Sequence, residues 1–214
     1  MALLYSSRFY LMVVPAIEQE RIADEQRLVL PGRHSWQQFQ AMQAWAEDIP
    51  GLRIIYLDGC IELMTTGKAH EQIKKFIAIL LEAYFFEMGI KFVPAGNATC
   101  EAQDRGASFA PDESYCIGED QEYPDLGIEV ILTSGGIGKL EKYKRFKVRE
   151  VWFWQKKQIS VHVLRDPEDA EKIRYEQVAK SELLPKLDLA LLEKCIQIPD
   201  VSEARAAFLK GFRA

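Results

Sequence analysis

One run of apolar residues limits what this chain can fold into. Residues 126–132 read LGIEVIL, and the only charged residue among these seven is Glu129. Continuous apolar runs of this length are typical of strands that are buried on both faces. A carboxylate in such a strand is costly unless it is paired with a cationic group or a metal ion. The run therefore predicts a buried strand in which Glu129 forms either an ion pair with a lysine of the next helix or part of a metal site.

Helices and further strands are expected on both sides of this run. A capping box at Ser35 predicts a helix over residues 35–48, and helical spacing of apolar residues predicts another over 70–88, ended by Gly89. Asp58-Gly59 is a strong hairpin signal between strands 52–57 and 60–65. The remaining expected elements are strands 90–93, 98–102, 114–117, 150–154 and 159–164, a helix over 138–146, and one or two helices in the last thirty residues. This order predicts an α/β or α+β fold with a mixed sheet flanked by helices.

The length of 214 residues fits one domain, expected over residues 26–214, after an arm over residues 1–25 that shows no periodicity. No apolar run approaches the roughly 20 residues of a membrane helix, so no membrane partner is expected. The four cysteines lack the spacing of a zinc site, and a cytoplasmic protein is the expectation.

Positive charge is concentrated in one short segment. Residues 139–149 contain six basic residues and one acid, whereas the whole chain has a net charge of −5. A local positive field of this kind suits nucleic acid, while the alternative is an ordinary solvated helix face.

A second acid, Asp112, follows Pro111 seventeen residues before Glu129 and lies close to another expected strand. Two carboxylates on neighbouring strands can bind one Mg²⁺ ion, which needs only one or two protein carboxylates. Asp125 also follows a proline, but it shares a strand with Glu129, about 13 Å away at the usual rise per residue. Asp125 is therefore expected at the strand entrance, in water or in a turn.

A lysine near the two acids would stabilise charge on a phosphate. On a helical wheel that starts at Leu140, Lys139 lies within the inward stripe and close to the end of the acidic strand. Lys142, Lys144 and Arg145 point mostly away from the core, and Lys147 lies on the stripe but further off. The alternative for Lys139 is a stem that runs along the core with its ammonium in water.

Residues 125–164 (DLGIEVILTSGGIGKLEKYKRFKVREVWFWQKKQISVHVL) resemble the Uma family of restriction-endonuclease-like proteins, within the PD-(D/E)XK nuclease superfamily. Shorter matches occur in the same order as in that family, and the resemblance covers roughly residues 28–165. They are Tyr56-Leu57-Asp58-Gly59, Ile61-Glu62-Leu63-Met64, His70-Glu71, Gly96-Asn97-Ala98-Thr99 and Pro111-Asp112-Glu113.

The resemblance implies a restriction-endonuclease-like core and metal-dependent hydrolysis of nucleic acid, DNA above all. Catalytic positions carry over to Glu62, Asp112, Glu129 and Lys139. Asp112 and Glu129 are the implied ligands of Mg²⁺, with Mn²⁺ as an alternative. The four catalytic positions are expected around one cavity. The expected nucleic-acid contacts are the basic residues Lys142, Lys144, Arg145 and Lys147.

One position departs from the family pattern, since many relatives have an acid where this chain has Ile131. Two functions are therefore compared: an active nuclease, and a nucleic-acid-binding protein that keeps the fold with weak or no activity. Restriction-type nucleases often act as dimers that cut both strands, so a homodimer is a further expectation.

Overall fold

The computed structural model describes residues 25–132 and 138–213. Of the arm expected over residues 1–25, all but Glu25 lies outside the described residues, and Glu25 begins the first strand.

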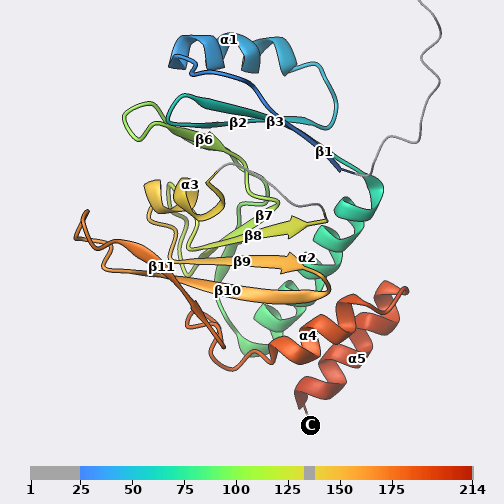
Figure 1. The fold of residues 1–214 in the computed structure, drawn as a ribbon. Coiled ribbons are helices and arrows are strands. Elements are labelled where there is room, and N and C mark those ends of the chain that lie inside the picture. The colour runs from blue at the N-terminus through green and yellow to red at the C-terminus, as the bar shows by residue number, and fades with distance from the viewer. Residues whose placement is uncertain (1–24, 133–137, 214) are drawn as a thin grey trace, which may run out of the picture.

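The first of two sheets is fully antiparallel and has the strand order β1-β3-β2-β6-β5. Its strands are β1 (Glu25–Val29), β2 (Leu52–Leu57), β3 (Cys60–Thr66), β5 (Cys100–Ala102) and β6 (Ala107–Phe109). The turn between β2 and β3 has positive φ at both Asp58 and Gly59, at 46° and 86°, as a two-residue hairpin requires. Helix α1 (Trp36–Ala46) covers the outer face of this sheet (Figure 1) and begins with the expected capping box of Ser35 and Gln38.

The second sheet is mixed and has the order β11-β10-β9-β8-β7-β4. Its strands are β4 (Phe92–Pro94), β7 (Glu113–Ile117), β8 (Leu126–Ile131), β9 (Glu150–Gln155), β10 (Gln158–Arg165) and β11 (Arg174–Val178). Strands β8 and β9 run parallel, and their connection includes helix α3 (Lys139–Arg145). The other neighbours in this sheet are antiparallel.

Each face of the second sheet has its own apolar cluster. One face packs against α2 (Lys68–Met88), α4 (Leu189–Ile196) and α5 (Val201–Arg213). The opposite face packs against α3 and the inner face of the first sheet, so that α3 lies between the two sheets (Figure 1). Alternate residues of β8 therefore belong to different clusters, with Val130 on the α2 side and Ile131 on the α3 side.

These findings confirm the predicted mixed α/β class and its principal elements. Three strands were missed: β1, β6 and β11. The sequences of β1 and β11 are EQRLV and RYEQV, and both strands lie at sheet edges, where solvent-facing polar residues hide the alternation of a strand. In the described part of the chain, no helix is long and apolar enough to cross a membrane.

Candidate active site

Two neighbouring strands bring Asp112 and Glu129 to one place in the second sheet. Asp112 directly precedes β7, and Glu129 lies within β8, which pairs with β7. Asp112 Oδ2 accepts a hydrogen bond of 2.7 Å from the backbone N–H of Val130, the residue that follows Glu129. The two residues are only 1% and 7% exposed. Both acids predicted from the sequence are therefore buried, and they lie on neighbouring strands at the β7–β8 junction.

Asp112 has two basic neighbours from other elements. Arg53 of β2 donates a hydrogen bond of 2.5 Å to Oδ1. His70, in the first turn of α2, has Nε2 at 3.0 Å from Oδ2. Asp112 therefore ties the first sheet, the second sheet and α2 together through a single carboxylate.

This network shifts the protonation of both acidic and basic members. Burial alone would raise the pKa of Asp112, but the hydrogen bond and charge of His70, the charge of Arg53 and the N–H of Val130 outweigh it and lower that pKa. Burial likewise lowers the pKa of His70, yet the hydrogen bond and charge of Asp112 dominate and raise it. The pair is therefore favoured in its ionised form.

Glu129 is bonded to two residues of α3. Lys142 Nζ lies 2.8 Å from Glu129 Oε1, and the Tyr143 hydroxyl donates a hydrogen bond of 2.6 Å to the same oxygen. Both bonds end on Oε1, so Oε2 is the oxygen that neither of them uses. The ion pair that was one of two expectations for Glu129 is thus present, and its lysine does come from the next helix.

Gly127 makes the Tyr143 contact possible. It lies two residues before Glu129 on β8, so the two residues share a face of the sheet. A Cβ atom added to Gly127 would lie 2.5 Å from Cε1 of Tyr143. The missing side chain lets the ring cross the strand and present its hydroxyl to Glu129. Burial, together with the charge and hydrogen bond of Glu129, raises the pKa of Tyr143 well above its ordinary value, so Tyr143 remains a donor.

The predicted orientation of Lys142 is wrong. This residue was expected to face away from the core as a nucleic-acid contact, but it is 5% exposed. On the wheel it lies only about 40° from Phe146, at the margin of the apolar stripe. The ion pair with Glu129 and the rings of Phe109 and Tyr143 are sufficient to draw it inward. Lys142 is therefore part of the buried site and not of a surface patch.

Lys139 and Glu62 stand in different settings. Lys139 is half-buried and begins α3, while the lysine that the structure places on Glu129 is Lys142. Glu62 is fully buried in β3, and its carboxylate accepts a hydrogen bond of 3.1 Å from Arg27 of β1.

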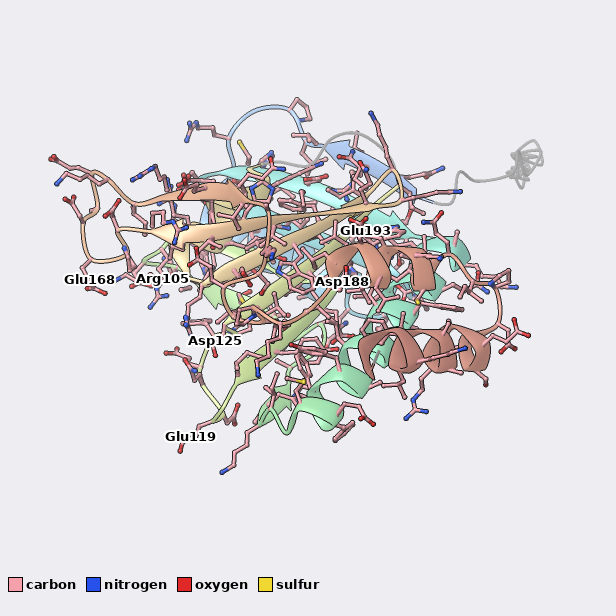
Figure 2. The ribbon with its side chains drawn as sticks, turned by 90° about the horizontal axis from the view of Figure 1, so that it is seen from below. Arg105, Glu119, Asp125, Glu168, Asp188 and Glu193 are labelled. Carbon is pink, nitrogen blue, oxygen red and sulfur yellow. The ribbon has the colours of Figure 1, made fainter. Side chains whose placement is uncertain are left out.

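The other basic residues of the segment have acidic partners on the surface. Lys144 pairs with Glu141, and Arg145 pairs with both Glu141 and Asp58. Lys147 pairs with Glu168, which Figure 2 shows in the loop between β10 and β11. The count of basic residues in the sequence therefore overstates the positive field of this segment, because nearby acids partly neutralise it.

Most of this chain matches a known family. The model of the Uma2 family, described as "Putative restriction endonuclease", matches residues 36–197. This chain belongs to the Uma2 family. A comparison with curated proteins finds no match.

The second proline-aspartate pair of this Uma2 protein, Pro124-Asp125, has a structural role in a turn. Asp125 directly precedes β8 and is 4% exposed. Its Oδ2 accepts hydrogen bonds from the N–H of Ile117 and from Gln121, and Arg149 lies 3.3 Å from Oδ1. The turn position was predicted correctly, but the carboxylate is buried and bonded within the turn.

The acids of the Uma2 site suit a hard divalent cation. Asp112 and Glu129 offer carboxylate oxygens from neighbouring strands, and Mg²⁺ completes its shell with water and phosphate oxygens. Among the described residues, no group of three or more His, Cys, Asp or Glu side chains lies close enough for an all-protein metal cage. Each carboxylate already has a cationic neighbour, Arg53 or Lys142, so a metal ion would bind in competition with these side chains.

A cavity of about 550 Å³ opens where the parallel strands β8 and β9 end. Carboxyl ends of parallel strands are a common place for ligands in α/β sheets. Described residues around it include Ile131, Trp154, Lys156 and Lys157. Ile131 is 5% exposed and belongs to the apolar cluster on the α3 side, so the family departure at this position serves packing.

Sequence reasoning missed Arg53 and Tyr143, and it named His70 only as a match to the family. The alternation of side chains along β2 could have predicted that Arg53 points inward, because it shares a face with the buried residues Ile55 and Leu57. A charged residue on an inward face requires a partner. Tyr143 gave no comparable signal, because its hydroxyl is used only once the fold brings it to Glu129.

Proposed function

We propose that this protein is a metal-dependent endonuclease that hydrolyses phosphodiester bonds of nucleic acid, with DNA as the expected substrate. The observation that carries the proposal is the burial of Asp112 and Glu129 on neighbouring strands, where Asp112 accepts a hydrogen bond from the N–H of Val130, the residue after Glu129. Membership of the Uma2 family supports the same class of reaction. Two buried carboxylates are expensive to maintain even when each has partners, which favours a functional reason for them.

In this proposal Asp112 and Glu129 hold Mg²⁺, and Mn²⁺ is the second candidate. When bound, the cation polarises a phosphoryl oxygen and lowers the pKa of a bound water. Arg53 and His70 keep Asp112 ionised and fix its orientation. Tyr143 of α3 orients Glu129 through the hydrogen bond from its hydroxyl. Lys139, at the start of α3, is the proposed source of positive charge for the phosphate, and Glu62 is assigned to the site by the family pattern.

Nucleic acid is proposed to lie along the solvent side of α3. Lys144, Arg145 and Lys147 have side chains that are 28%, 34% and 53% exposed. Phosphate oxygens can replace their present carboxylate partners, and such contacts weaken as salt rises. Lys142 is excluded from this set because it is buried.

One observation favours the second candidate, a nucleic-acid-binding protein with weak or no activity. Arg53 and Lys142 neutralise the two acids within the protein itself, so the fold does not require a metal ion for charge balance. The test of cleavage must therefore separate binding from chemistry.

The experiment is nicking of supercoiled plasmid in Mg²⁺ and in EDTA. We expect nicking only with Mg²⁺, and a loss of about 10²-fold or more in Asp112→Asn, as for removal of a principal electrostatic contact. Asp125→Asn is the matched control, since it changes the other buried proline-aspartate acid. DNA binding without nicking in wild type would favour the second candidate, and nicking that survives EDTA would contradict the metal-dependent reaction.

A further inference from the structure

Lys142 is enclosed by more than its ion pair. Its Nζ atom lies 2.8 Å from Glu129 Oε1, and also 4.7 Å and 5.3 Å from the ring centroids of Phe109 and Tyr143. The side chain is 7% exposed. Aromatic faces attract an ammonium, most strongly where water is excluded. The fold therefore holds this positive charge directly against a carboxylate of the candidate site.

A divalent cation and this ammonium would compete for the same carboxylate. Mg²⁺ lies about 2.0–2.1 Å from its oxygen ligands and requires near-ideal octahedral geometry. An ammonium at hydrogen-bonding distance from that carboxylate would repel the ion strongly, because a buried site screens charges poorly. Binding of a metal ion at Glu129 thus requires that Lys142 leave, or that the site accept a large repulsion.

We propose that Lys142 neutralises Glu129 in the metal-free protein and competes with the divalent cation for this carboxylate. The inference rests on the proposed function, since it assumes that Glu129 is a metal ligand.

The test measures the dissociation constant of Mn²⁺ by electron paramagnetic resonance of the free ion, with the full chain and no nucleic acid. Lys142→Met removes the charge and keeps much of the length and apolar character of the stem. We expect it to bind Mn²⁺ about tenfold or more tightly than wild type, because the competing cation is gone. Lys172→Met is the matched control: it removes the charge of an exposed lysine that pairs with Asp169, and it should leave the affinity unchanged.

Lys142→Met leaves Glu129 as a buried, unpaired carboxylate, so its stability is measured as well. We expect Mn²⁺ to raise the urea midpoint of this variant more than that of wild type, since the ion replaces the lost ammonium. Glu129→Gln/Lys142→Met removes both charges; it should fold without metal and lose the gain in affinity.

The outcomes separate the two proposals. Equal Mn²⁺ affinity in wild type and Lys142→Met, weakened in both backgrounds by Glu129→Gln, overturns the competition and leaves the metal site standing. Mn²⁺ affinity that Glu129→Gln leaves unchanged overturns the metal site itself, and the competition with it. If Lys142→Met is unfolded and Mn²⁺ does not restore its fold, the competition is likewise overturned.

Discussion

Two adjacent strands of the second sheet each bury a glutamate, and the two are held in different ways. Glu150 begins β9 and is fully buried. It accepts hydrogen bonds from the Ser181 hydroxyl, the N–H of Glu182 and, more distantly, the indole of Trp152. Glu129, in the parallel neighbour β8, is bonded to the ammonium of Lys142 and to Tyr143.

The difference between these carboxylates indicates which of them can serve chemistry. The donors on Glu150 are neutral, and one is backbone, so they fasten the segment around residue 181 to the sheet. The ammonium on Glu129 ends a flexible side chain and can be exchanged for another cation. The two proline-aspartate pairs differ in a similar way. Asp125 accepts bonds from its own turn and from the exposed Arg149, while Asp112 is bonded to the largely buried Arg53 and His70. Burial of an acid is therefore less informative than the kind of donor that accompanies it.

The largest effect on stability is expected at Asp112. Asp112→Ala leaves Arg53 and His70 without their shared anion, and removing one partner of a buried ion pair costs about 3–5 kcal/mol. Asp125→Ala strips donors that are mostly neutral, at about 1–3 kcal/mol. Urea denaturation at neutral pH measures both values. If Asp125→Ala proves the more destabilising variant, the contrast between Asp112 and Asp125 is wrong.

Gly127→Ala probes the packing that presents Tyr143 to Glu129. The added Cβ would meet the Tyr143 ring at 2.5 Å, and neither the strand nor the buried ring can give way without cost. We expect a loss of about 1–3 kcal/mol, typical of overpacking, together with reduced nicking. Thermal unfolding and the plasmid assay provide the two readouts. Gly211→Ala, where the new atom meets the tip of Leu191, is a control for a simple steric change and should retain nicking.

The smallest expected effect is a pH dependence carried by His70. Folding raises the pKa of this residue, so the stability it contributes is fully present below the unfolded-state pKa and is lost as pH rises through the folded value. We expect the free energy of unfolding of wild type to fall across this window relative to His70→Asn. Urea titrations from about pH 5.5 to 8.5 check this. Parallel profiles for the two proteins would show that His70 is not linked to folding in this way.

Much of the fold follows from local patterns, whereas the partners of the site do not. The apolar run of β8, the Asp58-Gly59 turn and the Ser35 capping box are local in sequence, and each predicted its element. The burial of Glu129 was also predictable, because it lies within a continuous apolar run. Asp112 was predicted to lie beside it because Asp112 is close to a neighbouring strand. Lys142 was misplaced because the wheel ranks positions by apolar neighbours only, while the fold adds a carboxylate and two rings that attract an ammonium. Arg53 reaches Asp112 from fifty-nine residues away, across two sheets, which helical or strand periodicity does not encode.

We propose that Glu129 serves the reaction, whereas Glu150 serves the fold. The direct test compares the nicking rates of Glu129→Gln and Glu150→Gln in Mg²⁺, below the melting temperature of both variants and at equal folded fraction. We predict that Glu129→Gln loses about 10²-fold or more of the rate. Glu150→Gln should be less stable than wild type by about 1–3 kcal/mol yet nick at nearly the wild-type rate. A Glu129→Gln protein that nicks as fast as wild type would contradict the account.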